Sequence, residues 1–229
     1  MKNQNGFTLI EILIALAIAG VVMAGVYSAY YSQQKSYVTQ EQVVAMQQNL
    51  RAAMYYMERE IRMAGCDPTE NAGAEIKTAD TDTIRFTLDI TGGESDGKDN
   101  DNDGSVDEED EKRFSDGFCD DTNEDITYSL ADNDGDGDND LEMNNNLIAE
   151  NIDALDFVYL DANGATTATL ANIRSVQITL VARTGRVDPG YTNNTVYRNQ
   201  QNTIILPAQN DNFRRKLLTA EIKCRNLGL

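Results

Sequence analysis

The sequence contains no histidine among its 229 residues. Histidine is the commonest general base and a principal ligand of zinc and copper, so its absence removes Ser/His and Cys/His nucleophile pairs and most transition-metal sites. Paired carboxylates remain as a route to glycoside hydrolysis. The acidic residues here are packed into Asp-x-Asp repeats, however, which lack the separate environments that move two pKa values apart. We therefore expect a protein that is not an enzyme.

Cysteine is scarce as well, with only Cys66, Cys119 and Cys224 and no Cys-x-x-Cys spacing. In an exported chain this set predicts one disulfide and one leftover thiol, and the spacing leaves the pairing open. In the cytosol all three would stay reduced and would behave as small hydrophobic residues.

Basic residues are outnumbered, since 19 Lys and Arg face 38 Asp and Glu, which gives a net charge of −19. Residues 91–142 hold 21 of the acidic residues and three bases, so this stretch has a net charge of −18 and the rest of the chain is almost neutral. A concentration of carboxylates repels the phosphates of nucleic acids and anionic lipids, and it attracts cations. We expect no nucleic acid partner at this acidic face.

A long apolar run occupies residues 7–29, where the only charged residue is Glu11. As a helix, its 23 residues extend about 35 Å, enough to cross a bilayer. Lys2 ahead of the run also permits a secretory signal peptide, cleaved near residues 27–29. A signal peptide core usually has about 7–15 residues and no carboxylate, whereas a Glu within a membrane costs about 2.5–3.5 kcal/mol and usually has a partner. The run therefore predicts a membrane helix that stays on the protein.

The residues Gly6-Phe7-Thr8-Leu9-Ile10-Glu11 resemble the class III signal of type IV pilins and type II secretion pseudopilins. The resemblance implies a leader peptide, residues 1–6, which a membrane-embedded prepilin peptidase removes by cutting between Gly6 and Phe7, followed by N-methylation of Phe7. It also implies that residues 7–30 span the membrane and that Glu11 pairs with the terminal ammonium of a neighbouring subunit. Pairing offsets the cost of both charges in hydrocarbon, so Glu11 would select the stagger between subunits. The alternative is an ordinary single-pass anchor with an isolated Glu.

Residues 32–64 continue as an amphipathic helix. Apolar residues recur there at intervals of three and four, which is the period of one helix face: Val43, Met46 beside Gln47, Leu50, Met54, Met57 and Ile61. No proline or glycine lies between Val26 and Met63, so we predict one helix over residues 7–64 that Gly65 and Pro68 end. The methionines are expected in a core rather than at a metal, because a thioether site needs several converging soft ligands.

Two further stretches resemble the minor pilins called PilW-like. The first runs from Gln34-Lys35-Ser36-Tyr37 through Glu58-Arg59-Glu60-Ile61-Arg62-Met63-Ala64-Gly65, and the second is Asn172-Ile173-Arg174-Ser175-Val176-Gln177-Ile178-Thr179-Leu180-Val181-Ala182-Arg183. This resemblance covers the helix and the carboxy-terminal half, whereas the middle of the chain departs from the pattern.

A chain of this length has room for one globular domain beside the long helix, and we place this head at residues 65–229. Alternating apolar residues predict strands at residues 83–90, 126–130, 155–160 and 173–182, and a hairpin or edge from residues 195–197 and 202–206. Residues 216–224 favour a strand, although their Leu-Leu-Thr-Ala-Glu run also permits a helix. An antiparallel sheet packed on the amphipathic helix gives an α+β fold, as the pilin resemblance also implies.

The first acidic loop, residues 96–110, contains a close match to the twelve-position calcium loop from Asp99 to Asp110. Oxygen ligands fall at positions one, three, five, nine and twelve. With Ser105 added, the candidate ligands are Asp99, Asp101, Asp103, Ser105, Asp107 and Asp110. Gly104 holds the sixth position, where the loop turns sharply. Asp110 is shorter than the usual Glu, so Glu108 or Glu109 is an alternative twelfth ligand.

The second acidic loop, residues 132–142, repeats the Asp-x-Asp-x-Asp-Gly core without a carboxylate at its twelfth position, Met143. Its candidate ligands are Asp132, Asp134, Asp136, Asp138 and Asp140. Calcium needs six to eight oxygen ligands, and both loops supply them in register, so calcium is the predicted cofactor. The alternative is a solvated, mobile acidic loop.

The expected function is that of a minor pilin that primes a type IV pilus or sits at its tip. Its partners would be other pilins or pseudopilins, contacted through the N-terminal helix, and the prepilin peptidase. It would be a single-pass protein of the bacterial inner membrane with its head outside the cytoplasm, and later part of the pilus or the cell surface. The alternatives are a J-type pseudopilin of a type II secretion system and a calcium-dependent pilus adhesin.

Overall fold

The computed structural model describes residues 6–132, 135 and 137–228. The chain forms two compact units, Met1–Val44 and Ala45–Leu229. The α-helix α1 (Leu9–Met63) has 55 residues; it begins in the first unit and ends in the second. The continuous helix predicted for residues 7–64 is thereby confirmed, with its start two residues later and its end one residue earlier.

The first unit contains the apolar part of α1 and the polar turns of the same helix that follow it, up to Val44. Large hydrophobic side chains are exposed along the run, from Leu9 at 77 % to Tyr30 at 61 %. By length and composition the helix is able to cross a membrane. Tyr27, Tyr30 and Tyr31 end the run, and aromatic residues are typical of the boundary between lipid and water. Because no face of this segment is covered within the unit, it requires lipid or other helices around it.

The second unit buries one face of α1 from Ala45 onward. The buried side chains lie three or four residues apart, as the stripe predicted from the sequence does: Met46, Leu50, Ala53, Met54, Met57 and Ile61. The three methionines are therefore core residues, as expected.

The end of α1 depends on Gly65. Its φ of 76° lies in the left-handed region, which glycine adopts without strain, and its amide donates to the carbonyl of Thr87 at 3.0 Å. A Cβ at this position would lie 2.4 Å from Cδ2 of Leu227. Asn226 also donates to the carbonyl of Met63 at 3.2 Å, so the carboxy-terminal segment covers the helix end.

The largest sheet has five antiparallel strands in the order β1-β2-β3-β4-β5. Their bounds are β1 (Ile76–Ala79), β2 (Ile84–Thr87), β3 (Asp125–Ala131), β4 (Asp140–Met143) and β5 (Asn146–Ala149). Ile84 and Phe86 in β2 and Ile126 and Tyr128 in β3 alternate along their strands and are almost fully buried, so one face of this sheet belongs to the core.

The second sheet has three antiparallel strands in the order β10-β7-β6, formed by β6 (Ile152–Leu160), β7 (Ser175–Arg183) and β10 (Arg215–Lys223). The central strand β7 is buried at seven of its nine residues. The 3-10 helix η3 (Leu170–Asn172) precedes it. A separate antiparallel pair joins β8 (Tyr197–Arg198) to β9 (Ile204–Leu206). The hydroxyl of Tyr159 in β6 donates to the carbonyl of Asp80 at 2.8 Å, which ties the three-stranded sheet to the β1–β2 turn.

The α+β fold with a long helix packed on antiparallel sheets is confirmed. Every predicted strand region contains a strand, the segment at residues 216–224 is strand rather than helix, and residues 195–206 form the expected hairpin. The sequence did not predict β1, β4 and β5, and the one expected sheet is divided into three.

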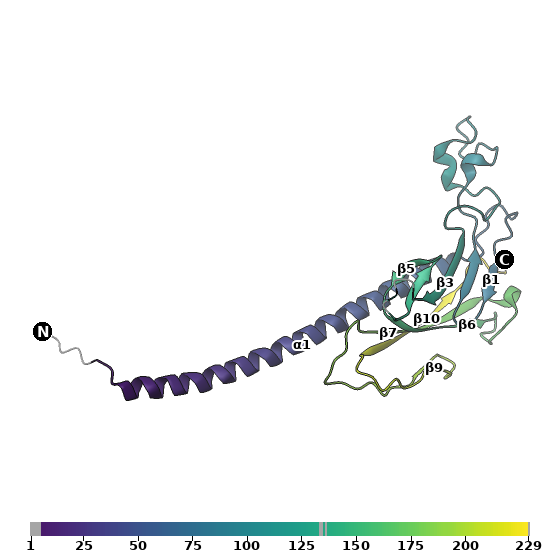
Figure 1. Ribbon diagram of the computed structural model, residues 1–229. Coiled ribbons are helices and arrows are strands. Elements are labelled where there is room, and N and C mark those ends of the chain that lie inside the picture. The colour runs from purple at the N-terminus through teal and green to yellow at the C-terminus, as the bar shows by residue number, and fades with distance from the viewer. Residues whose placement is uncertain (1–5, 133–134, 136, 229) are drawn as a thin grey trace. The chain divides into compact units, whose positions relative to one another are not determined.

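Between β2 and β3 the chain leaves the five-stranded sheet. We call residues 88–124 the acidic lobe; it contains the 3-10 helices η1 (Gly93–Ser95) and η2 (Glu109–Arg113). In Figure 1 most of this segment, in blue to teal, stands apart from the strands at the top of the view. Backbone hydrogen bonds close it, from Gly92 to the carbonyl of Lys112 at 3.3 Å and from Gly93 to the carbonyl of Phe114 at 2.9 Å.

Candidate functional site

At the start of α1, Glu11 and Thr8 cap the helix. The carboxylate Oε2 of Glu11 accepts hydrogen bonds from the amide and the hydroxyl of Thr8, both at 2.8 Å, and the Thr8 hydroxyl accepts from the amide of Glu11 at 3.3 Å. This reciprocal arrangement is a capping box. Gly6 and Phe7, the predicted cleavage pair, precede it and are exposed.

Glu11 also opens a shallow hollow along one helix face. The hollow is lined by Phe7, Glu11, Ile12, Ala15, Leu16 and Ala19. Glu11, Ala15 and Ala19 are four residues apart and share a face, so two small side chains follow the carboxylate. Small residues let helices approach closely in a membrane, which makes this face suited to helix packing.

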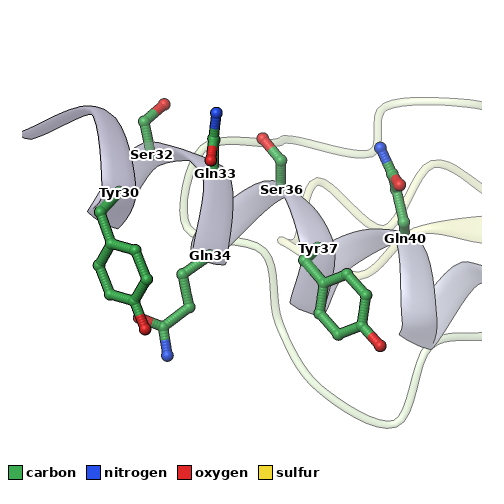
Figure 2. A pocket seen from close by; sticks show the side chains of 7 residues that line it. All are labelled: Tyr30, Ser32, Gln33, Gln34, Ser36, Tyr37 and Gln40. Atoms are coloured by element: carbon green, nitrogen blue, oxygen red, sulfur yellow. The ribbon is translucent and has the colours of Figure 1, made fainter. Parts of the chain in front are cut away.

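A second hollow lies where the apolar run gives way to polar residues. Figure 2 shows Tyr30, Gln34 and Tyr37 on one side of the helix and Ser32, Gln33, Ser36 and Gln40 on the other. These side chains are hydroxyls and amides, so the hollow offers hydrogen bonds but no ionised group.

In the first acidic loop, three of the predicted ligands converge. One carboxylate oxygen each from Asp99, Asp101 and Asp103 lies within 4.8 Å of the other two. The amide of Asp103 donates to Asp99 and Asp101, at 3.1 Å each, and the amide of Gly104 donates to Asp99 at 3.0 Å. Gly104 has a φ of 104°, so the sharp turn expected at position six is present.

The other predicted carboxylate ligands of this loop, Asp107 and Asp110, do not join that group among the described residues. The carboxylate of Asp107 accepts from the amide of Gly97 at 2.7 Å, Ser105 is exposed, and Asp110 lies in η2. Glu108, one of the two alternatives to Asp110, is half-buried. Burial of its carboxyl raises its pKa, a hydrogen bond from Ser105 opposes this shift, and the charges of Asp103 and Asp110 add to it.

Glu111, which the sequence analysis did not single out, organises the loop. Its side chain is fully buried and accepts from the amides of Asn100 and Glu108, the latter at 3.0 Å. Glu108 and Glu111 form a capping box on η2. The Glu-x-x-Glu spacing was the available signal, although a capping box usually begins with Ser or Thr.

The second acidic loop is only partly described, because Asp134 and Asp136 lie outside the described residues. Asp132 accepts from the amide of Gly135 at 2.9 Å. Asp138 is buried and paired with Arg183 of β7, and Asp140 is the buried first residue of β4, where it accepts from the amide of Asn151 at 2.9 Å. A calcium ion in this loop stays a prediction, and Asp138 and Asp140 already have protein partners.

A third group of carboxylates, Asp116, Asp120 and Asp121, was not predicted. One oxygen from each also lies within 4.8 Å of the other two. The spacing of these residues matches no calcium-loop pattern, so their convergence could not be predicted from a local motif.

The three cysteines are free thiols, so the disulfide expected for an exported chain is not formed in this structure. Cys66 and Cys119 are half-buried, and burial is the main cause that raises the pKa of both thiols. The charge of Asp89 adds to the shift of Cys66, and the charge of Glu124 adds to that of Cys119, where a hydrogen bond with Thr87 opposes it. Cys224 is buried, which raises its pKa to about 12. A thiol with a raised pKa has little nucleophilic thiolate near pH 7.

Two family models match the chain. Residues 1–27 match the prokaryotic N-terminal methylation motif, and residues 125–226 match the type IV pilus-assembly protein W family, PilW. The structure is similar to that of a type IV-like pilin from Thermus thermophilus, with a TM-score of 0.46, 12 % identity, and coverage of 79 % of this chain and 97 % of that one. A comparison with curated proteins finds no match.

A methylation motif on an apolar helix that continues into a β-rich head defines a type IV pilin-like protein, and this chain is one. Its carboxy-terminal part is a PilW domain, so within that class it is a minor pilin of the PilW kind.

Proposed function

We propose that this protein helps to start a type IV pilus or occupies its tip. The observation that carries the proposal is the presence of the methylation motif and the PilW domain in one chain. The motif implies removal of residues 1–6 by a prepilin peptidase, and pilin-type proteins assemble with other pilins. A role of this kind requires no catalytic group, and we infer that the protein is not an enzyme.

Glu11 is suited to guide assembly. Both of its bonds from Thr8 go to Oε2, and a carboxylate has about four acceptor positions. The same residue is therefore able to cap its own helix and accept the terminal ammonium of a neighbouring Phe7. The small residues Ala15 and Ala19 on the same face leave room for that neighbour.

The exposed apolar run supports a position in the inner membrane before assembly. With residues 7–30 in lipid as a single span, the head would lie outside the cytoplasm. Transfer into a fibre would exchange lipid for neighbouring helices around the same side chains.

Fibre assembly tests this proposal in the native host. Glu11→Gln keeps the size of the side chain and removes the charge, so we expect the variant in the membrane at the normal level but at least about tenfold depleted from sheared pili. Glu41→Gln, an exposed position farther along α1, is the matched control. Mass spectrometry of the wild-type protein should show residues 1–6 missing and Phe7 methylated. An intact Met1 in assembled protein, or Glu11→Gln at the control level in fibres, would contradict the proposal.

We also propose calcium in the acidic loops, supported by the convergence of Asp99, Asp101 and Asp103. Glu108 and water would complete the oxygen ligands. In calorimetry on the metal-free full-length chain in detergent, Asp99→Asn with Asp101→Asn should remove a calcium-binding event that the wild type has. If this variant and the wild type give the same heats of binding, the proposal that the first acidic loop binds calcium is wrong.

The PilW match favours the pilus over a type II secretion system. Deletion of the gene separates the roles: loss of pili with normal secretion supports the minor pilin, and the reverse supports a J-type pseudopilin. An adhesin would instead leave pili intact and abolish surface attachment when calcium is chelated.

A further inference from the structure

The carboxylates of Asp116, Asp120 and Asp121 form a second converging group in the acidic lobe, between η2 and β3. Asp116 and Asp121 are half-buried and Asp120 is exposed, so the group is only partly open to solvent. The carboxylate of Asp116 is oriented by the amide of Phe118, which donates to its Oδ1 at 2.8 Å.

Gly92 forms the inner wall of this group. A Cβ on Gly92 would lie 2.4 Å from Oδ2 of Asp121 and 2.7 Å from Oδ2 of Asp116. Both carboxylates therefore pack directly against the glycine Cα. Gly92 also forms an isolated bridge with Ser115, which brings residues far apart in the sequence to the same place.

The charge of the group is not balanced by the bases of its own segment. Lys98 pairs with Asp96 at 3.0 Å, Lys112 lies 3.9 Å from Glu94, and Arg113 stacks on the ring of Phe114 at 5.0 Å. Carboxylates held this close repel one another unless a cation lies among them.

A buried carboxylate beside the group, that of Asp89, has one oxygen without a hydrogen-bond partner among the described residues. Asp89 is fully buried; its Oδ2 accepts from the Thr69 hydroxyl at 3.0 Å and from the amide of Gly117 at 3.2 Å, but its Oδ1 has no hydrogen-bond partner among the described residues. Gly117 directly follows Asp116, so its hydrogen bond places the carboxylate of Asp89 next to the backbone of this group. An orphaned oxygen in a fully buried side chain on this side of the group points to a missing ligand.

Glu124 links the group to the residues that follow β2 through hydrogen bonds. It is fully buried, and its Oε1 accepts from the amides of Ile90 and Thr91 at 2.7 and 2.8 Å, while Oε2 accepts from the amide of Asp121 at 3.3 Å. These bonds fix Asp121 relative to the β2 end of the lobe. Glu124 is thus a positioning residue, comparable to the outer partners that orient metal ligands.

We propose that Asp116, Asp120 and Asp121 bind a divalent cation, with Asp89 on its buried side, at a site separate from the first acidic loop. The ligands are all hard carboxylate oxygens, and calcium accepts irregular sets of oxygen ligands more readily than the strictly octahedral magnesium. The ion would close the chain between Gly92 and Glu124 and so fix the base of the acidic lobe on the five-stranded sheet.

Counting bound ions tests the site with calcium chloride alone as the probe. Three metal-free, full-length proteins in detergent are titrated with calcium. They are the wild type, a first variant with Asp116→Asn and Asp121→Asn, and a second variant with Asp99→Asn and Asp101→Asn. We expect the first variant to lose one equivalent and the second variant to retain that equivalent. The control, Asp82→Asn with Glu150→Gln, removes two exposed carboxylates outside both groups and should bind as the wild type does.

The outcomes separate this site from the first loop. If Asp116→Asn with Asp121→Asn binds as many ions as the wild type, this inference is wrong even where the first loop binds calcium. Since two changes at half-buried positions risk misfolding, Asp120→Asn provides a second test at the exposed member: affinity for one equivalent should fall about tenfold with an unchanged circular dichroism spectrum. Unchanged affinity in that folded variant also overturns the proposal.

Discussion

Arg215 in β10 and Asp153 in β6 form an ion pair across the whole three-stranded sheet, since β7 lies between their strands. Nε of Arg215 donates to Asp153, and its two terminal nitrogens donate to Asp211 at 2.6 and 2.7 Å. Arg183, opposite Arg215 in β7, lies 3.7 Å from Asp153 and also pairs with Asp138. The side chain of Arg215 is only 2 % exposed, so its guanidinium joins the three strands with little contact with solvent.

Removal of this charge should destabilise the head. Arg215→Met keeps the apolar stem and leaves Asp153 and Asp211 without their common partner, and breaking a buried ion pair from one side costs about 3–5 kcal/mol. Urea denaturation of the full-length chain in detergent measures the change in the free energy of unfolding. Arg51→Met, at an exposed site on α1, should change it by less than about 0.5 kcal/mol. Equal effects of the two substitutions would show that the ion pair contributes nothing.

The buried face of α1 yields a second prediction. Met57 is fully buried, whereas Met63, on the same helix, is 40 % exposed. Met57→Ala should lower the free energy of unfolding by about 2–5 kcal/mol, because it removes apolar contacts and leaves a cavity, and Met63→Ala should cost much less. Thermal unfolding of both variants makes the comparison, and a smaller loss for Met57→Ala than for Met63→Ala would contradict the buried stripe.

The long helix and the longer strands were predictable because their signals are local. The stripe from Met46 to Ile61 repeats with the helical period, and β7 and β10 are nine-residue apolar or alternating runs. By contrast, β4 has only four residues, and two of them are the buried acids Asp140 and Glu142. Its sequence therefore resembled the acidic loop before it and was assigned to that loop. Those acids are buried by residues that are distant in the sequence, so no local pattern predicts their burial.

The convergence of three carboxylates in the first acidic loop was predictable for the same reason, since Asp99, Asp101 and Asp103 are spaced two residues apart. The group at Asp116, Asp120 and Asp121 depends instead on the bridge between Gly92 and Ser115, and the Asp138 pair depends on Arg183, 45 residues away. Long-range contacts of this kind place side chains together without leaving a spacing in the sequence.

Asp156 provides a prediction for pH dependence. Burial in β6 raises its pKa above the ordinary 3.8, although the Asn199 side chain donates to it at 2.9 Å and opposes the shift. The folded state therefore holds this proton more tightly than the unfolded state does, so the contribution of Asp156 to stability is most favourable below pH 3.8 and falls as the pH rises through the raised pKa. Asp156→Asn removes the buried charge and should raise the melting temperature near pH 7, with a gain that shrinks toward pH 3. A gain that does not change with pH would exclude titration of Asp156 as its cause.

Two glycines after α1, Gly65 and Gly73, allow the cost of backbone strain to be measured separately from the cost of steric overlap. Gly65 and Gly73 both have φ in the left-handed region, 76° and 64°, but only at Gly65 would a Cβ meet another atom, Cδ2 of Leu227 at 2.4 Å. Gly73→Ala should therefore cost only the backbone strain of about 1–2 kcal/mol, and Gly65→Ala should cost more. Adding Leu227→Ala to Gly65→Ala should recover part of the extra loss, because it removes the overlapping side chain while the strain remains. Denaturation of the three variants measures these differences; if Gly65→Ala proves no worse than Gly73→Ala, the packing of Leu227 against the end of α1 has no energetic consequence.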